Sequence, residues 1–200
     1  MKKHVFEAAL ALVLPFGLGT GLARASTWEI DAAHSAAQFS VRHMMVSNVR
    51  GEFGKVTGTV NLDDKDITKS TVDVTIDVSS INTREAKRDE HLKGPDFFDA
   101  AKFPIITFKS RKVESAGQGK LKVTGDLTLH GVTKSVVLDV EGPSGEVKDF
   151  MGNWKRGASA MTKLSRKDFG LQWNKVLETG GVAVGDEVNV TIDVELNKKK

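Results

Sequence analysis

The chain of 200 residues contains no cysteine. Disulfide bonds, a thiolate nucleophile and a cysteine-ligated metal are therefore excluded, and the fold must depend on a hydrophobic core. Signatures of catalysis are also missing from the sequence. It has no G-x-S-x-G nucleophile elbow, no H-E-x-x-H metal motif and no glycine-rich phosphate loop. We therefore expect no cofactor and no metal centre.

A large excess of charge of one sign is lacking as well. The net charge is +3, and residues 1–25 contribute three basic residues and one acidic residue to it. The rest of the chain is nearly neutral. Nucleic-acid binding needs a dense basic face, so we expect no nucleic-acid partner. The three lysines at 198–200 are expected to form a solvated tail.

The apolar run at the N-terminus is short. Two lysines open the chain, residues 8–14 are apolar, and Ala-Arg-Ala at 23–25 fits a small-x-small cleavage site. This pattern is typical of a secretory signal peptide. We expect residues 1–25 to be removed between Ala25 and Ser26, which leaves residues 26–200 as one periplasmic domain. A membrane anchor is the alternative, but the run is shorter than the ~20 residues of a membrane span. No stable membrane span is therefore expected.

What the chain does contain is a repeated pattern of strands with one apolar and one polar face. Val72, Val74 and Ile76 alternate with polar residues, and the segments 121–129, 136–140 and 188–196 repeat the pattern. Such alternation indicates a sheet that is buried on one side. Because little helical sequence is available to cover that side, the sheet must close on itself as a barrel or a sandwich. We expect an all-β fold with strands near 28–30, 36–42, 54–62, 71–78, 105–114, 120–129, 135–141, 154–164 and 187–196.

One segment interrupts the strands with a helical pattern. Thr83 can cap a helix over 83–92, and the Gly-Pro pair at 94–95 can end it. Arg84, Arg88 and His91 would then lie along one side of this helix. Guanidinium and imidazole groups suit the anionic head of a ligand, so these three residues are head-group candidates. The alternative is an ordinary solvated helix face.

The connection that follows, 95–104, is rich in phenylalanine. Phe97, Phe98 and Phe103 lie in a segment with no clear strand pattern. Aromatic side chains in such a connection are expected to plug one end of the barrel. Trp173, which precedes a glycine pair, is expected near the rim.

Eight short segments of the chain carry a resemblance to a known family. They are DAAHS at 31–35, QFSVRH at 38–43, RDEHL at 88–92, FFD at 97–99, FP at 103–104, FKS at 108–110, GDLTLHGVTK at 125–134 and SRKDFG at 165–170. In this order they resemble the YceI-like family of polyisoprenoid-binding periplasmic proteins. The resemblance implies a lipocalin-like antiparallel β-barrel of about eight strands with one or two short helices. It also implies a long apolar cavity that takes isoprenoid or similar long-chain lipids.

Apolar side chains on the inward faces of the strands, with the aromatic residues of the plug and rim, are the candidates for the cavity wall. An apolar tail needs length and apolar walls rather than specific polar contacts. The alternative is that these side chains simply fill the barrel. The candidates are Phe39, Val60, Val74, Ile76, Phe97, Phe98, Phe108, Leu127, Leu138, Trp173 and Val190.

The leading hypothesis is a non-enzymatic periplasmic binding or carrier protein for a long-chain apolar lipid, either an isoprenoid or quinone-type chain or a fatty-acid derivative. One alternative is a lipid hydrolase or isomerase in the same barrel. It would use His34, His43 or His91 as general base and Arg88 as anion site. The other is a structural barrel with a filled core. An exposed strand edge could also pair to form a homodimer.

Overall fold

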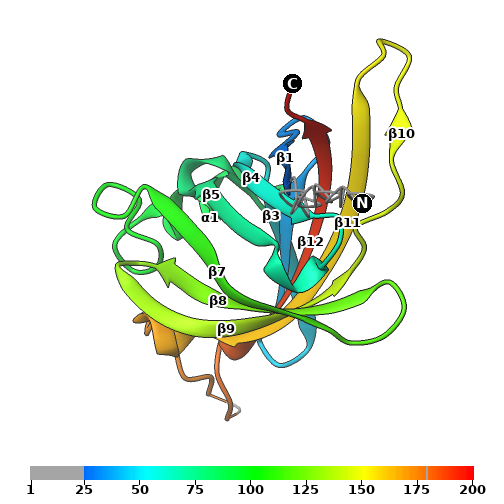
Figure 1. Cartoon of the computed structure of the whole chain (residues 1–200). Helices are drawn as coiled ribbons and strands as arrows, with labels where there is room; N and C mark the ends of the chain where they lie inside the picture. The colour runs from blue at the N-terminus through cyan, green and yellow to red at the C-terminus, as the bar shows by residue number, and fades with distance from the viewer. Residues whose placement is uncertain (1–24, 179) are drawn as a thin grey trace, which may run out of the picture.

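The structure, a computed structural model, describes residues 25–178 and 180–200. Within these residues, twelve strands form one continuous sheet (Figure 1). A single α-helix and three short 3-10 helices complete the secondary structure of this part of the chain. In chain order the elements are β1 (Ala25–Ile30), β2 (Ala36–His43), β3 (Ser47–Phe53), β4 (Val56–Asp63), η1 (Ile67–Lys69), β5 (Thr71–Asp77), η2 (Val78–Ser80), β6 (Ile81–Asn82), α1 (Ala86–Lys93), β7 (Ile105–Ser115), β8 (Lys120–Leu129), β9 (Val132–Glu141), β10 (Val147–Lys148), β11 (Trp154–Ser165), η3 (Arg166–Phe169) and β12 (Val184–Lys198).

Eight of the strands close into an antiparallel barrel. Around the ring the order is β1, β4, β5, β7, β8, β9, β11 and β12, and β12 pairs with β1 to complete the circle. Closure leaves no strand edge open around the ring, which is the arrangement expected for a sheet with one apolar face. The expected all-β barrel of about eight strands is confirmed.

The long strand β12 links the barrel to a second group of strands. One edge of β12 pairs with β11 along eleven residues of each strand. Its other edge is shared, because the C-terminal part pairs with β1 and the remainder with β2. Strands β2, β3 and β6 therefore extend one end of the barrel beyond the closed ring.

The hairpin expected over 120–141 is present as β8 and β9. Leu129 pairs with Val132, so His130 and Gly131 form a two-residue turn. Both turn residues have positive φ, 51° for His130 and 73° for Gly131. This is the backbone of a type I′ turn, whose twist matches that of the flanking strands.

Two local expectations were wrong. No strand was expected at β3, where the inward position between Val49 and Phe53 is Gly51. A Cβ at Gly51 would lie 2.5 Å from Cζ of Phe39, so the glycine makes room for that ring and hides the apolar alternation. The helix also begins later than expected. Its cap is Glu85, whose side chain accepts a hydrogen bond from the backbone N–H of Lys87, rather than Thr83.

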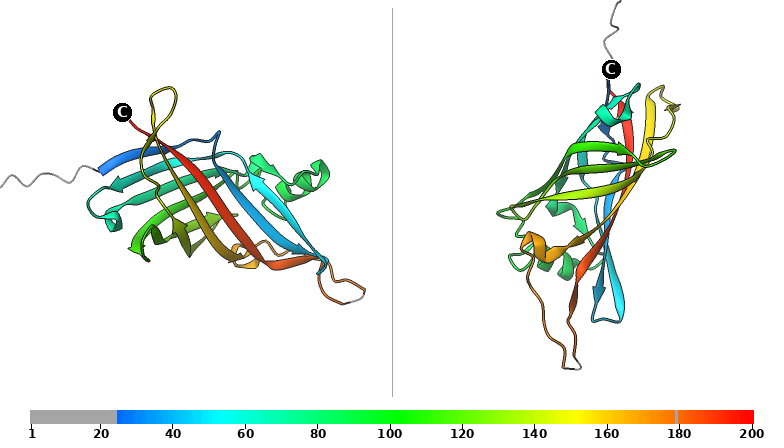
Figure 2. Two further views of the ribbon diagram at one scale, coloured as in Figure 1. Left: turned by 90° about the vertical axis from the view of Figure 1, so that its right-hand side faces the viewer. Right: turned by 60° about the horizontal axis from the view of Figure 1, so that its bottom comes forward.

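The two ends of the barrel differ in what covers them. In the left view of Figure 2, α1 lies at the end opposite the C-terminus, and the hairpin that carries β10 lies at the same end as the C-terminus. None of the helices described is long and apolar enough to cross a membrane. The apolar cavity described next lies between these two ends.

Candidate functional site

An apolar cavity of about 210 Å³ lies inside the barrel. Along β8 its lining runs from Leu121 to Leu129, which corresponds to about 26 Å of strand. The alternate residues of β8 point into it, as period-two alternation requires. Most candidates for the cavity wall do line it: Phe39, Val60, Val74, Ile76, Phe108, Leu127, Leu138 and Val190.

The cavity wall is almost free of polar groups. Among the described residues that line it, none is charged, and the polar ones are Gln38, Ser70, Ser159 and Thr162. Two of these hydroxyls are already engaged in the fold. Ser70 Oγ accepts a hydrogen bond from the backbone N–H of Asp63 at 3.1 Å, and Ser159 Oγ donates to Asp193 Oδ1 at 2.6 Å. The wall therefore offers shape and apolar contact but little polar recognition.

Three wall candidates lie outside the cavity lining. Phe98 packs edge-on against Phe53, with ring centroids 5.5 Å apart, so it lies behind a wall residue. Phe97 and Trp173 contact each other at 5.2 Å, and both rings contact that of His91. These aromatic residues pack around α1. Phe98 packs with Val78, Ile81 and Ile106, in a cluster that also contains Leu92 of α1.

Trp173 owes its place to a buried arginine. Nη1 of Arg166 donates to the backbone oxygens of Leu171 at 2.5 Å and of Trp173 at 2.9 Å, and Nε donates to that of Gly185. Burial lowers the pKa of this guanidinium, an effect that Asp186 opposes. Arg166 thus ties Leu171 and Trp173 to Gly185 at the start of β12, which is a structural role.

The three head-group candidates do not meet at the cavity. Arg84 precedes α1, with φ of 64°, and is exposed, so the expected row along one helix side is wrong. Arg88 donates from Nε to Thr83 Oγ1 and from Nη2 to Thr83 O, both at 2.8 Å. His91 Nε2 lies 2.9 Å from Asp96 Oδ2. None of the three lines the cavity within the described part of the chain.

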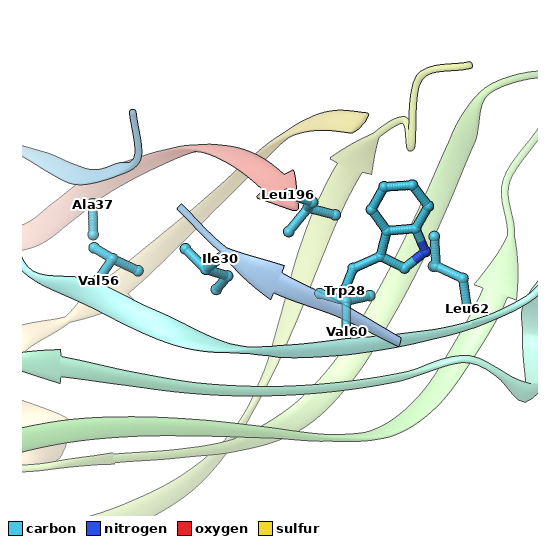
Figure 3. Packing of buried hydrophobic residues seen from close by; sticks show 7 residues of the cluster. All are labelled: Trp28, Ile30, Ala37, Val56, Val60, Leu62 and Leu196. Carbon is cyan, nitrogen blue, oxygen red and sulfur yellow. The ribbon is translucent and has the colours of Figure 1, made fainter. Parts of the chain in front are cut away.

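Charged side chains gather instead at the opposite end, in the layer of residues beyond the cavity. Arg156 is directly opposite Leu196 in the register of β11 and β12, so the two side chains share the inward face. Its guanidinium carbon lies 5.2 Å from the centroid of the Trp28 ring. Lys198 Nζ lies 5.4 Å from the same centroid. Trp28 itself is fully buried and packs with Leu62 and Leu196, which line the cavity (Figure 3).

A carboxylate from the hairpin that carries β10 faces these cations. Glu146 Oε1 lies 2.9 Å from Lys198 Nζ and 3.3 Å from Nη2 of Arg156. Lys198 and Arg156 hold the pKa of Glu146 below its ordinary value. The expectation of a solvated lysine tail is therefore wrong for Lys198, and Lys199 also pairs with Glu29. Lys198 and Arg156 continue the inward parity of β12 and β11.

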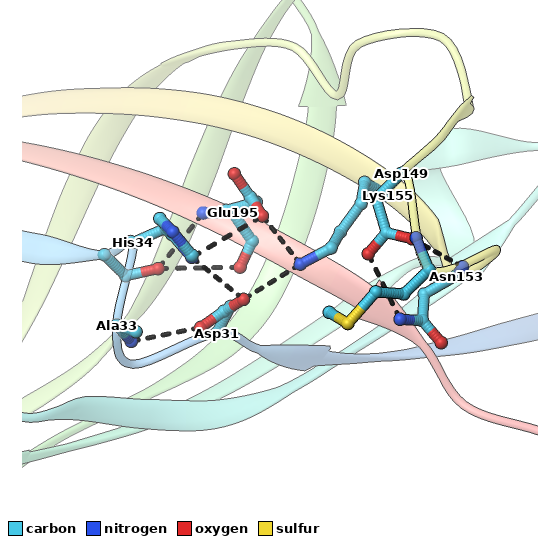
Figure 4. A network of polar contacts seen from close by, with 9 residues as sticks. Asp31, Ala33, His34, Asp149, Asn153, Lys155 and Glu195 are labelled. Atoms are coloured by element: carbon cyan, nitrogen blue, oxygen red, sulfur yellow. Dashed lines mark hydrogen bonds and ion pairs between the residues drawn. The ribbon is translucent and has the colours of Figure 1, made fainter.

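A second charged group lies on the outer surface of the same end. Lys155 Nζ donates to Asp31 Oδ2 at 2.9 Å and to Glu195 Oε1 at 2.7 Å (Figure 4). The bond from Lys155, followed by that from His34, holds the pKa of Asp31 well below its usual range. Asp31, His34 and Glu195 could together approach a metal ion. The ammonium of Lys155 already supplies the positive charge between the two carboxylates, so this is a structural ion cluster.

The other histidines serve the fold or lie away from the cavity. His130 Nδ1 lies 3.2 Å from the backbone oxygen of Phe169, and its ring packs on Phe103. His43 ends β2 opposite Ser47. In the described part of the chain no histidine lines the cavity. None of the described residues that line the apolar space is a histidine or a charged residue that could act as general base.

The fold and the cavity define the class: a meandering antiparallel barrel that encloses an apolar space. Comparison with known proteins agrees. The YceI-like domain family matches residues 28–196, and this chain belongs to that family. A UPF0312 protein of Vibrio parahaemolyticus is 40% identical over 171 residues, covering 84% of this chain and 88% of the relative.

Solved structures show the same barrel. The YCEI protein of Campylobacter jejuni is 35% identical, with a TM-score of 0.64 over 79% of this chain and 90% of that protein. A polyisoprenoid binding domain from Saccharophagus degradans has a TM-score of 0.63 over 86% of this chain and 98% of that domain. At 16% identity, the second likeness shows the fold alone.

Proposed function

We propose that this protein is a non-enzymatic periplasmic binding or carrier protein for a long-chain apolar lipid, a polyisoprenoid or a quinone-type chain. The observation that carries the proposal is the cavity: long, closed by the barrel, and lined by apolar side chains with no charged group among the described residues. A hydrocarbon chain has no hydrogen-bonding groups to satisfy. It therefore fits such a wall without the cost of burying an unpaired polar group.

The free energy of binding would come from many small contributions. Each methylene moved from water to an apolar site contributes ~0.8 kcal/mol before ordering costs are subtracted. The wall residues on β8 repeat along about 26 Å of strand, so a longer chain meets more of them. This predicts selectivity for chain length. The solved polyisoprenoid binding domain of the same fold supports the general idea that such a barrel can enclose a chain of this kind.

The chemistry of the wall favours a binding protein over an enzyme. A hydrolase or isomerase needs a general base within hydrogen-bonding reach of its substrate. His34 bonds Asp31 on the outer surface, and His91 bonds Asp96 beside α1. Both histidines lie away from the apolar space, where the lipid chain would be held.

The periplasmic part of the proposal rests on the leader pattern. Residues 1–24, where most of that pattern lies, are outside the described residues. Mass spectrometry of the protein from a periplasmic fraction should give an N-terminus at or close to Ser26. Recovery of the chain with Met1 intact in that fraction would contradict the assignment.

The decisive experiment is organic extraction of natively purified protein, followed by mass spectrometry of the extract. A lipid in near-stoichiometric amount, absent from a mock purification, is the expected result. A polyprenyl ester or diphosphate that is incubated with the protein should remain chemically unchanged. Turnover that is lost in His91→Ala would point to the enzyme, and a lipid-free protein that also fails to bind added lipid would point to a filled barrel.

A further inference from the structure

We propose that Arg156 and Lys198 form a binding site for the anionic head group of the lipid, and that Glu146 occupies this site in the structure as an internal substitute. The inference rests on the proposed lipid-binding function and adds the chemical class of the ligand: a long apolar chain that ends in a phosphate or a carboxylate. None of the residues that sequence analysis marked for the head group takes part.

The position of the site follows from strand register. Arg156 pairs with Leu196, and Ala158, two residues further along β11, pairs with Val194. Ala158, Val194 and Leu196 all line the cavity. Arg156 is therefore the next inward residue beyond the apolar wall. A ligand whose chain fills the cavity toward this end would bring its head group to the guanidinium.

The contacts of Arg156 leave its guanidinium only loosely paired with carboxylates. Glu146 Oε1 lies 2.9 Å from Lys198 Nζ and 3.3 Å from Nη2 of Arg156, and Asp64 Oδ1 lies 3.7 Å from the same Nη2. Nη1 of Arg156 donates to the backbone oxygen of Ser144 at 2.9 Å. Among the described residues, Nε of Arg156 is a buried nitrogen without a hydrogen-bond partner. A phosphate or carboxylate can accept two parallel N–H bonds from one guanidinium, which the present contacts of Arg156 do not provide.

The occupying carboxylate sits on a segment that is not part of the barrel ring. Glu146 lies in the hairpin between β9 and β11, where β10 pairs with β11 through only two residues of each strand. The tip of this hairpin carries Phe150, which is fully exposed. The barrel ring, in contrast, closes through β9, β11 and β12. An incoming anion can therefore displace Glu146 and leave the ring intact.

The test compares two probes with the same chain, farnesyl monophosphate and farnesol. Wild-type protein should bind the phosphate more tightly than the alcohol. Glu146→Gln removes the competing charge and should raise the affinity for farnesyl monophosphate roughly tenfold, because a charge-assisted contact is freed. Farnesol should be unaffected. Glu187→Gln, at an exposed carboxylate paired with Lys163, is the matched control and should change neither affinity.

Loss of the guanidinium should act in the opposite direction. Arg156→Gln should lower the affinity for farnesyl monophosphate roughly tenfold and spare farnesol. Lys198→Gln should do the same to a smaller extent, and it serves as the test if Arg156→Gln does not fold. Arg111→Gln, at an exposed arginine paired with Asp126, is the control.

Phosphorus NMR gives a readout that chain binding alone would not produce. The second pKa of a phosphate monoester is ≈ 6, and nearby cations favour the dianion. Bound farnesyl monophosphate should therefore titrate at lower pH in wild type than in Arg156→Gln. Equal affinities for both probes, unmoved by Glu146→Gln and without this shift, would overturn the head-group site while leaving lipid binding intact. If neither probe binds any variant, the lipid-binding function itself fails.

Discussion

At the scale of single residues, Gly125 allows an aromatic ring to form part of the cavity wall. A Cβ added to Gly125 would lie 2.5 Å from Cζ of Phe108 and 2.6 Å from the backbone oxygen of Lys109. Real Cβ contacts are longer than this, so the ring or the strand would have to shift. The glycine on β8 thus fixes where the Phe108 ring lies.

Gly125→Ala should therefore lower stability and lipid content together. Overpacking of this kind costs typically 1–3 kcal/mol, and the displaced Phe108 ring would enter the cavity. Urea unfolding of the two proteins measures the first effect and lipid extraction the second. Gly54→Ala is the control, because nothing lies within 4 Å of a Cβ at that position. Equal unfolding midpoints for the two variants would show that the ring has room to move.

The Asp31 cluster predicts a pH dependence of stability. Lys155 is the main cause that lowers the pKa of Asp31 in the folded protein, and His34 adds to it. A carboxyl group with a lowered folded pKa stabilises the protein above its unfolded pKa of ≈ 3.9, and this stabilisation is lost as pH falls toward the folded value. Asp31→Asn should therefore be less stable than wild type at pH 7 and pH 5, with the gap narrowing at pH 3.

Denaturant unfolding at the three pH values measures that gap. Asp139→Asn removes an exposed carboxylate that pairs with Lys122, and it should differ little from wild type at pH 7. A gap for Asp31→Asn that is as wide at pH 3 as at pH 7 would mean that its effect is not electrostatic.

At the scale of elements, the side chain of Arg88 joins helix α1 to the segment before it. The sequence alone suggests this residue as a candidate for binding the ligand head group. The guanidinium of Arg88 donates to the hydroxyl and the backbone oxygen of Thr83, which is itself buried. Arg88→Ala should cost about 1–3 kcal/mol of stability, since it leaves buried acceptors unpaired. It should not change affinity for farnesyl monophosphate. Arg84→Ala, at an exposed position, is the control for stability, and a selective loss of phosphate binding in Arg88→Ala would restore it as a head-group residue.

The alternation on β5 predicts which face tolerates charge. Ile76 lines the cavity, whereas Thr71 on the same strand is exposed. Ile76→Asp places a carboxylate in an apolar interior and should cost roughly 3 kcal/mol or more, which thermal unfolding would detect. Thr71→Asp adds the same group to the outer face and should be mild. Similar losses in both variants would contradict the assignment of faces.

Most of what the sequence predicts about the strands comes from the period-two alternation of apolar and polar residues. This alternation identifies the inward faces of β5, β8, β9 and β12, because apolar residues of one parity occupy most of each of these strands. It fails at β3, where the inward Gly51 makes room for a phenylalanine from the neighbouring strand. The pattern of alternating apolar residues also fails to identify Arg156 and Lys198 as inward residues, because a charged residue at an inward position resembles the end of a strand. Their meeting over Trp28 depends on the register of three strands, which a single sequence does not specify.

At the scale of the whole molecule, the cavity is one space closed differently at its two ends. The end near α1 is packed with Phe53, Phe98 and their neighbours. The opposite end is covered by Trp28, Arg156 and Glu146. Between the ends the ring has two short junctions, because only three residues of each strand pair where β9 meets β11 and where β1 meets β12. We therefore expect retention of the apolar chain of the proposed lipid to depend on the free volume along the barrel.

Leu127 is the position at which this dependence on volume is best tested. Its side chain lines the cavity and packs against both the cluster around Phe53 and the cluster around Phe108. Leu127→Trp should fill space that the lipid chain needs, and we expect co-purified lipid to fall at least severalfold at a stability cost of about 1–3 kcal/mol. Lys122→Trp puts the same ring on the outer face of β8, where it should leave lipid content unchanged. Extraction with mass spectrometry measures the lipid, and circular dichroism checks that both variants keep the β-fold. Full lipid occupancy in a folded Leu127→Trp protein would place the ligand outside the barrel.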